Sequence, residues 1–562
     1  MINNQESDAV FHFIKMKRRI ILLNLVFGKG SYGDSAGNFP ASRKGKFLEI
    51  IQAYGGSIFL DEEQGLIALF GLPKTYEDLA QRVLRAAHEL LVPGASGKKP
   101  GEMPPFSILL DSKLVTVSEL NQGQTYQFLE QAQVIEQLTE ITSKVPAGKW
   151  LISKDTLPML RHSSPALALE PSTALEGWWE IRHFDPTHTT RHEGLVNLNL
   201  EKNLTRLNTL GELLLAGIGR TAVLIGESGV GKSSLLQAWQ AHFNKQPGAD
   251  AVRWVELSAC PYRKNLPHRL TLELLASLVG LDFSEQDDGL PGQLLEGLTR
   301  LKACPADLDL QNLKDFLTVT YIGEQAAATL PEEHIEIKLN EMLRRILERL
   351  ANENPLVIVI DNLHHADAHS AHILAELCAE TSLAPILACL ITRPEYQSEG
   401  WQLINRLESS LGNQVVRIAL DRLSVDETET LIADILQTEL DTAPVANFIY
   451  YLAEGNPLFT ATLTKKLLSN GKITQSGQGW IIQGELGIED MPEVVCTMMS
   501  AEFDRLPPEV QQTYKVACIF GKTLQEVILR DALSGQRDAA SIRKDLGILE
   551  KNGLIRLIKA SP

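Results

Sequence analysis

The stretch GESGVGKSS, Gly226 to Ser234, decides the fold of the middle of this chain. An apolar run, TAVLI, precedes it, and the segment SSLLQAWQAHF follows it with Leu235, Trp239 and Phe243 on one face of a predicted helix. Gly-x-x-x-x-Gly-Lys-Ser between a strand and a helix is the pattern of a loop whose backbone N–H groups surround phosphate. The sequence therefore predicts a nucleotide site in this loop.

The residue types of the loop match separate parts of that chemistry. Its glycines let the backbone curl around phosphate groups, Lys232 can reach the terminal phosphates, and the Ser233 hydroxyl is suited to ligate Mg²⁺. The residues predicted to bind the nucleotide are Gly226, Ser228, Gly229, Val230, Gly231, Lys232, Ser233 and Ser234.

A second strand supplies the acid that such a loop requires. In NENPLVIVIDNLHHAD, Leu356 to Ile360 form a continuous apolar run that predicts a buried parallel strand, with Asp361 at its carboxyl end. Asp361 is predicted to hold Mg²⁺ together with Ser233. The preceding segment, HIEIKLNEMLRRILERL, has apolar residues at helical spacing, so strands and helices alternate as in a parallel α/β sheet.

The residues after Asp361 bear on hydrolysis. Asn362 can donate a hydrogen bond but cannot accept a proton as a general base, so we expect slow turnover. Asp367 has two interpretations: it replaces the missing acid, or it caps the next helix. His364 and His365 have no third ligand at a metal-binding spacing, so no metal site is predicted there.

Composition limits the other functions. A chain of 562 residues with 44% hydrophobic and 22% charged residues is expected to form about three or four domains. The net charge of −17 repels a phosphate backbone, so a nucleic-acid partner would require a local basic patch, and no such partner is predicted. Six cysteines occur singly, and no apolar run is long enough to span a bilayer, so we expect a cytoplasmic protein without a membrane segment.

Taken in order, VLIGESGVGKSSLL, VIVIDNLHHAD, LITRPEY, LDRLSVDETETLI and AEGNPLF resemble the STAND-type signalling ATPases of the AAA superfamily. The resemblance runs from about Gly194 to the C-terminus and implies a switch between ADP-bound and ATP-bound states, with protein partners or self-association. It implies a sensor role for Arg393, beside Lys232 and Asp361 in the catalytic set, and nucleotide contact for Pro457. The alternatives are a surface arginine and a helix-start proline.

The C-terminal residues resemble the winged-helix module that follows in this family. The segment SIRKDLGILEKNGLIRL has an apolar helical face. Its basic residues fit either a DNA-binding stripe or a solvated face, and the interspersed acids favour an internal regulatory arm. These residues are Arg543, Lys544, Lys551, Arg556 and Lys559. Relatives commonly continue into helical repeats, so this sequence is expected to be a fragment or a short version.

In the amino-terminal third, the segment GGSIFLDEEQGLIALFGLPKTYEDLAQRVLRAAHELL resembles a class III adenylate/guanylate cyclase domain. The segments VPAGKWLIS and ALEGWWEIRHF resemble the last strands of that domain. The coverage is about Arg18 to Phe184. Neutral residues stand at the positions that the resemblance assigns to metal, purine and transition-state contacts: Asn24, Gln64, Leu60, Gln133 and Gln137. Because two metals need carboxylates, the resemblance implies a fold without its chemistry. The alternative is an unrelated α+β domain.

Together these features predict an α/β multidomain protein: a ferredoxin-like α+β cyclase-homology domain (1–185), a P-loop NTPase parallel sheet (186–400), a helical lid (401–470) and a winged helix (471–562). The predicted function is an ATP/ADP-binding signalling switch with slow hydrolysis. An active adenylate cyclase regulated by the ATPase module, an ATP-dependent transcription regulator and a scaffold that binds no nucleotide are the alternatives.

Overall fold

The structure is a computed structural model, and it divides into two compact units, Met1–His188 with Glu493–Pro562, and Thr189–Pro492. It describes residues 15–27, 41–62, 65–91, 106–120, 125–128, 131–142, 144–146, 148–164, 167–184, 200–260, 268–281, 290–301, 332–381, 384–477, 479–484, 490–520, 524–534, 537–551 and 554–555. Among these residues, no helix combines the length and the apolar character needed to cross a membrane.

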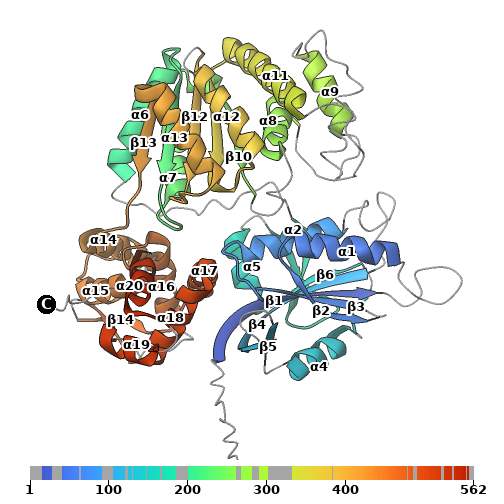
Figure 1. Ribbon diagram of the computed structural model, residues 1–562, viewed down its shortest axis with the longest axis vertical. Helices are drawn as coiled ribbons and strands as arrows, with labels where there is room; N and C mark the ends of the chain where they lie inside the picture. The colour runs from blue at the N-terminus through green and yellow to red at the C-terminus, as the bar shows by residue number, and fades with distance from the viewer. Residues whose placement is uncertain are drawn as a thin grey trace, which may run out of the picture. The chain divides into compact units, whose positions relative to one another are not determined.

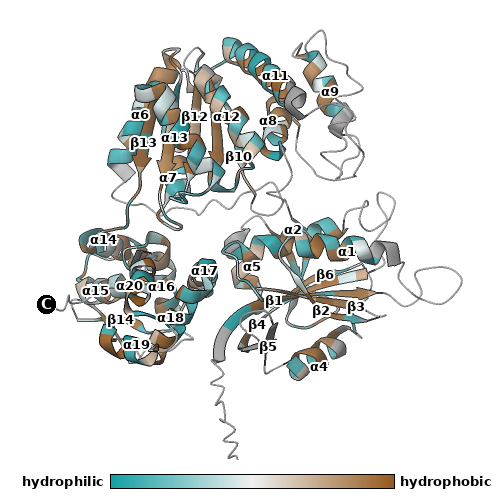
Figure 2. Cartoon of the chain, viewed as in Figure 1, coloured by the Kyte–Doolittle hydropathy of each residue, from teal (hydrophilic) through white to brown (hydrophobic). Residues whose placement is uncertain are grey.

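The second unit contains a parallel sheet of five strands in the order β10-β11-β12-β9-β13. The strands are β9 (Arg220–Ile225), β10 (Arg253–Ser258), β11 (Leu356–Asp361), β12 (Ile386–Thr392) and β13 (Val415–Ala419). Figure 2 shows that these strands are mainly hydrophobic, as expected for a parallel sheet with helices on both faces. The predicted strand before Asp361 is confirmed, and it is the sheet's second strand.

Alternate residues of each strand enter two separate cores. Val357 and Val359 pack with α6 (Leu200–Leu215) and α7 (Lys232–Phe243) on one face. Ile358 and Ile360 face the opposite core. That core includes buried residues of α8 (Arg269–Val279), α9 (Leu290–Arg300), α11 (Glu332–Glu353), α12 (Ala368–Glu380) and α13 (Glu399–Leu411). The predicted apolar face of α7 is confirmed, because Leu235, Trp239 and Phe243 are fully buried.

A helical subdomain follows the sheet. It consists of α14 (Val425–Leu436), α15 (Ala443–Ala453), α16 (Pro457–Ser469) and the hairpin β14 (Ile473–Ser476) with β15 (Gly479–Ile482). Ile432, Ile449, Leu463 and Ile473 share one core. The hairpin therefore packs with the helices, although we predicted a winged helix from residue 471. Likewise, β13 joins the sheet beyond the predicted boundary at residue 400, because it pairs with β9.

The first unit contains an eight-stranded amino-terminal sheet in the order β2-β3-β1-β4-β6-β8-β7, with β5 paired to β4. The strands are β1 (Lys15–Phe27), β2 (Ser57–Glu62), β3 (Gly65–Phe70), β4 (Phe106–Leu120), β5 (Thr125–Phe128), β6 (Trp150–Ser153), β7 (Ala168–Pro171) and β8 (Trp178–His183). In Figure 1, α1 (Ala41–Ala53), α2 (Leu79–Leu91) and α5 (Leu157–Ser163) lie on one side of the sheet and α4 (Gln131–Thr142) on the other.

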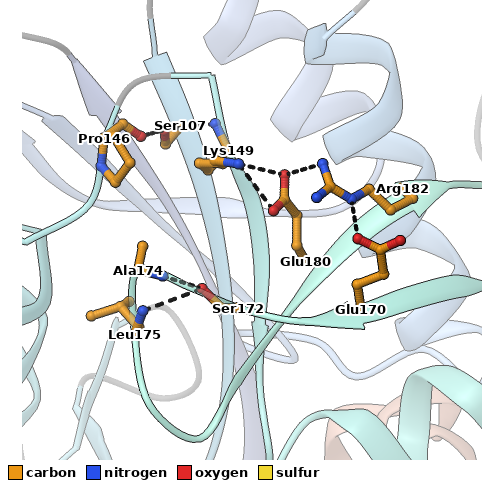
Figure 3. A network of polar contacts seen from close by, with 9 residues as sticks. All are labelled: Ser107, Pro146, Lys149, Glu170, Ser172, Ala174, Leu175, Glu180 and Arg182. Carbon is orange, nitrogen blue, oxygen red and sulfur yellow. Dashed lines mark hydrogen bonds and ion pairs between the residues drawn. The ribbon is translucent and has the colours of Figure 1, made fainter.

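One edge of this sheet is held by a charged network, shown in Figure 3. The buried Glu180 carboxylate on β8 accepts hydrogen bonds from Lys149 Nζ at 2.9 and 3.0 Å and from an Arg182 guanidinium nitrogen at 2.9 Å. Arg182 Nε also donates to Glu170 on β7 at 2.8 Å. Two cations therefore compensate the negative charge of the buried Glu180 carboxylate. The Arg182–Glu170 contact links β8 to the edge strand β7.

Four C-terminal helices complete the first unit: α17 (Glu493–Arg505), α18 (Pro508–Ile519), α19 (Glu526–Ala532) and α20 (Ala539–Lys551). Ile542 and Leu549 of the predicted apolar face are buried, and Leu546 is partly buried. The described residues after Glu493 contain no strand, so the wing of the predicted winged helix is not among them. The winged helix stays a prediction.

Helix α17 contacts the amino-terminal sheet through a buried ion pair. Arg18 on β1 binds the Asp504 carboxylate with two guanidinium nitrogens, one of them at 2.6 Å, and both side chains are almost fully buried. The same carboxylate accepts the Thr75 backbone N–H at 2.7 Å. Arg505 and Glu77 add a second pair at 2.9 Å. The end of α17 is therefore anchored to the first strand and to the segment after β3.

Candidate nucleotide-binding site

The glycine-rich loop joins β9 to α7, as predicted. Gly229 and Gly231 have φ angles of 78° and 99°, a backbone region that favours glycine, and Gly231 is the N-cap of α7. Val230 between them is buried. The loop therefore ends at a helix N-terminus, where backbone N–H groups and the helix dipole favour an anion.

Lys232, Ser233 and Ser234 form the first turn of α7. The Lys232 ammonium group donates to the carbonyl oxygens of Gly226 and Glu227, both at 2.7 Å. These contacts hold its charge at the loop. A phosphate bound to the loop N–H groups would therefore meet a cation that the fold already holds at the loop.

Asp361 ends β11, and its carboxylate accepts the Asn362 backbone N–H at 2.7 Å. Asn362 has φ 53°, and its side-chain amide donates to the Ser258 hydroxyl at 3.0 Å. Ser258 lies opposite Asp361 in the pairing of β10 with β11. Asn362 therefore links the ends of two strands, and its amide has no proton-accepting role in that contact.

Sheet topology brings Arg393 to the start of the loop. Arg393 directly follows Thr392, the last residue of β12, and the Thr392 carbonyl accepts the Gly226 backbone N–H at 3.3 Å. The β12–β9 register pairs Thr392 with Ile225. The sensor role of Arg393 stays a prediction.

The helical subdomain touches the loop at Asn456 and Leu458. Asn456 Nδ2 donates to the Ser228 carbonyl at 2.8 Å, and the Leu458 backbone N–H donates to the Gly229 carbonyl at 3.2 Å. A side chain on Gly229 would place its Cβ 2.6 Å from Asn456 Oδ1, and the φ angle of 78° is strained for other residues, so glycine is favoured there. Pro457, which lies between these two residues, is the first residue of α16.

Sequence reasoning missed Asn456 and also Arg422. Asn456 is the N-cap of α16, a role that an Asn before Pro could have suggested. The half-exposed Arg422 guanidinium binds Glu227 of the loop at 2.7 Å and Glu454 at the end of α15 at 2.8 Å. This arginine joins the loop to the helical subdomain, and no local motif marks it.

The structure places three further residues that follow Asp361 in the sequence: His364, His365 and Asp367. Asp367 caps α12 by accepting the Ser370 backbone N–H, which is the capping interpretation. The rings of His364 and His365 lie 4.0 Å apart, and His364 is buried. Among the described residues, one cluster of side chains is close enough together to hold a metal ion, and it contains neither His364 nor His365.

In the amino-terminal sheet, Asn24 is buried on β1 opposite Ile67 of β3, next to the β2–β3 hairpin. Leu60 is on β2, and Gln133 and Gln137 are exposed on α4. The remaining predicted positions lie outside the described residues: Gln64 and, at the C-terminus, Arg556 and Lys559.

Parts of the chain are similar to known proteins. An uncharacterized protein of Rhizobium meliloti (strain 1021) is 27% identical over 299 residues, which are 50% of this chain and 27% of that protein. The chain thus spans about a quarter of the length of this curated relative. The structure of the Aeropyrum pernix ORC1 protein in complex with DNA is similar over 64% of this chain and 86% of that one, with 13% identity and a TM-score of 0.33.

Two solved cyclases are similar to a smaller part of the chain. The guanylyl cyclase Cya2 is 21% identical, with a TM-score of 0.22 over 32% of this chain and 96% of that one. The adenylyl cyclase CyaB from P. aeruginosa is 15% identical, with a TM-score of 0.23 over 30% and 97%. The family model described as AAA ATPase domain matches residues 201–391, which include the glycine-rich loop and Asp361. Residues 201–391 therefore form an AAA ATPase domain.

Proposed function

We propose that this chain is a STAND-type signalling switch that binds ATP or ADP with Mg²⁺, hydrolyses ATP slowly, and carries a cyclase-like domain without cyclase activity. The contact of Asn456 and Leu458 with the loop carbonyls carries the proposal. Because the helical subdomain binds the same loop that would hold phosphate, a change at the phosphates alters the contacts of that subdomain. Such differential contact is what a ligand needs to shift a conformational equilibrium.

Slow hydrolysis is supported by Asn362. Its amide is engaged with Ser258, and an amide cannot take a proton from the attacking water. Lys232, Asp361 and Arg393 would then serve to bind the triphosphate and Mg²⁺ and to sense the γ-phosphate. A slow enzyme keeps the ATP-bound state long enough to act as a signal.

Absence of cyclase activity is supported by Asn24. Asn24 is buried on β1, the strand between β3 and β4, at the position that the cyclase resemblance assigns to a metal-binding aspartate. A neutral amide is a poor bridge between two Mg²⁺ ions because it supplies no charge to offset theirs. In this proposal the amino-terminal domain has a regulatory role in the switch. The C-terminal helices are its neighbours, because the end of α17 is attached to the amino-terminal sheet.

The experiment that tests the proposal measures the identity and fate of nucleotide. The purified chain is denatured and the released nucleotide chromatographed; fresh chain is then incubated with Mg·ATP or Mn·ATP, and ADP and cyclic AMP are followed. We expect co-purified ADP, slow ADP formation and no cyclic AMP. Cyclic AMP formed by the purified chain above the amount formed by a mock preparation without it would overturn the inactive-cyclase proposal. Absence of any bound nucleotide would overturn the switch.

A further inference from the structure

We infer a second ligand site in the AAA ATPase domain, a site for a divalent transition-metal ion such as zinc, formed by His268, Glu336 and His369. One ligand-capable atom from each of these residues lies within 4.8 Å of the other two. None of the three belongs to the glycine-rich loop, and neither Asp361 nor Ser233 takes part. The inference therefore does not depend on the proposed switch.

Three helix beginnings bring these residues together. His268 is the N-cap of α8, Glu336 lies near the start of α11, and His369 is the second residue of α12. His369 Nδ1 lies 2.5 Å from Glu336 Oε1, and the two imidazole rings are 4.8 Å apart between centroids. His268 is buried, whereas Glu336 and His369 are partly exposed, so an ion can enter from their side.

Hydrogen bonds hold the two histidine-bearing helices independently of any ion. The His268 backbone N–H donates to Asp367 Oδ1 at 3.1 Å, and the same oxygen accepts the Ser370 N–H at 2.8 Å. The Thr271 backbone N–H and hydroxyl both reach the Ser370 hydroxyl, at 3.2 and 3.1 Å. These buried contacts fix the backbones at both histidines, which is the support that a preorganised site requires.

The donor set determines the class of ion. Two imidazoles and one carboxylate suit zinc and similar transition metals, and three protein ligands leave a fourth position for water. Neighbouring ligand atoms around tetrahedral zinc lie about 3.3 Å apart, so side-chain shifts on the order of 1 Å would close the group around an ion. Imidazole binds metal in its neutral form, and the Glu336 carboxylate supplies negative charge to the ion.

The ion would join three helices around the strand that ends in Asp361. Helix α11 leads into β11, α12 follows it, and α8 follows the neighbouring strand β10. Zinc bound here would therefore restrain both chain segments that flank Asp361, from a position outside the predicted phosphate contacts.

The test uses the full chain, stripped with a chelator, incubated with zinc sulfate, freed of excess metal and analysed by mass spectrometry for zinc. We expect about one more equivalent per chain in the wild type than in His369→Ala or Glu336→Gln. The matched control is His372→Ala, on the same helix, because His372 is exposed and pairs with Glu376 at 3.6 Å. It should retain the wild-type zinc content.

A second measurement separates metal loss from unfolding. Far-UV circular dichroism without zinc checks that each variant folds, and titration with Co²⁺ checks for the visible absorption of a tetrahedral site. We expect at least about tenfold weaker Co²⁺ binding in Glu336→Gln, which alters a partly exposed residue and conserves its shape. Equal zinc and Co²⁺ binding by the wild type and by folded Glu336→Gln and His369→Ala would overturn the site and leave only the Glu336–His369 hydrogen bond.

Discussion

Two arginine contacts link helical segments to the two sheets, and they differ in burial. Arg18 and Asp504, which attach α17 to the amino-terminal sheet, are 5% and 8% exposed in their side chains. Arg422 and Glu227, which attach the helical subdomain to the glycine-rich loop, are 35% and 47% exposed. A buried pair is costly to break because it leaves a charge without solvent, whereas an exposed pair exchanges easily for water.

The difference teaches which contact is suited to a switch. The contact at the loop is made of a half-exposed ion pair and two hydrogen bonds, so its free energy is comparable to what a γ-phosphate can supply. The contact at Asp504 is buried, bidentate and reinforced by the Thr75 N–H. We therefore expect the helical subdomain to respond to nucleotide while α17 stays attached to its sheet.

The largest expected effect is that of Asp504→Ala. Removing the carboxylate leaves Arg18 buried without its partner, which is expected to weaken the attachment of α17 by about 3 to 5 kcal/mol. Cys496 on α17 reports detachment, so its labelling by a thiol reagent, followed by peptide mass spectrometry, should accelerate roughly 100-fold or more. Glu509→Gln, at an exposed acid of α18, is the control and should not change the rate.

A comparable effect is expected of Lys232→Ala at the glycine-rich loop. Losing a charge-assisted contact to phosphate should weaken ATP binding roughly 100-fold, measured by calorimetric titration. Lys245→Ala provides the comparison, because Lys245 is exposed just after α7 and should keep wild-type affinity. Unchanged affinity in Lys232→Ala would show that this loop is not the nucleotide site.

A smaller change is expected of Asn362→Asp, which gives the strand end a second acid. Aspartate conserves the shape and tolerates the positive φ angle of residue 362, so the fold should persist. A positioned general base typically accelerates a reaction by about 100-fold or more. We therefore expect ADP formation, followed in a coupled assay, to be at least about tenfold faster in the variant. Asn354→Asp, at an exposed position before β11, controls for added charge. A rate equal to wild type would mean that the acid is not what limits hydrolysis.

The smallest effect is expected of Arg422→Ala. An exposed pair contributes less than about 1 kcal/mol, so ADP release, followed with a fluorescent analogue, should accelerate only about threefold. Lys465→Ala on the exposed face of α16 should leave the release rate unchanged. ADP release that accelerated roughly 100-fold, as thiol labelling is expected to do in Asp504→Ala, would contradict the distinction between a stable and a responsive contact.

The parts of the molecule that sequence predicted are those with local signals. The loop, its strand and helix, the strand before Asp361 and the face of α7 all follow from glycine positions and apolar spacing within short segments. The contacts that were missed join distant residues: Asn456 reaches a carbonyl 228 positions earlier, and Arg18 binds an acid 486 positions later. No spacing rule covers such distances.

The sequence by itself determined that a phosphate-binding type of loop precedes a buried strand with a terminal acid, because glycine conformations and strand patterns are properties of short segments. Tertiary structure alone decided that β13 belongs to the sheet, that the hairpin after residue 471 packs with the helical subdomain, and that His268, Glu336 and His369 meet. The physical reason is that such meetings depend on how whole helices and strands pack, and packing is a property of the complete chain.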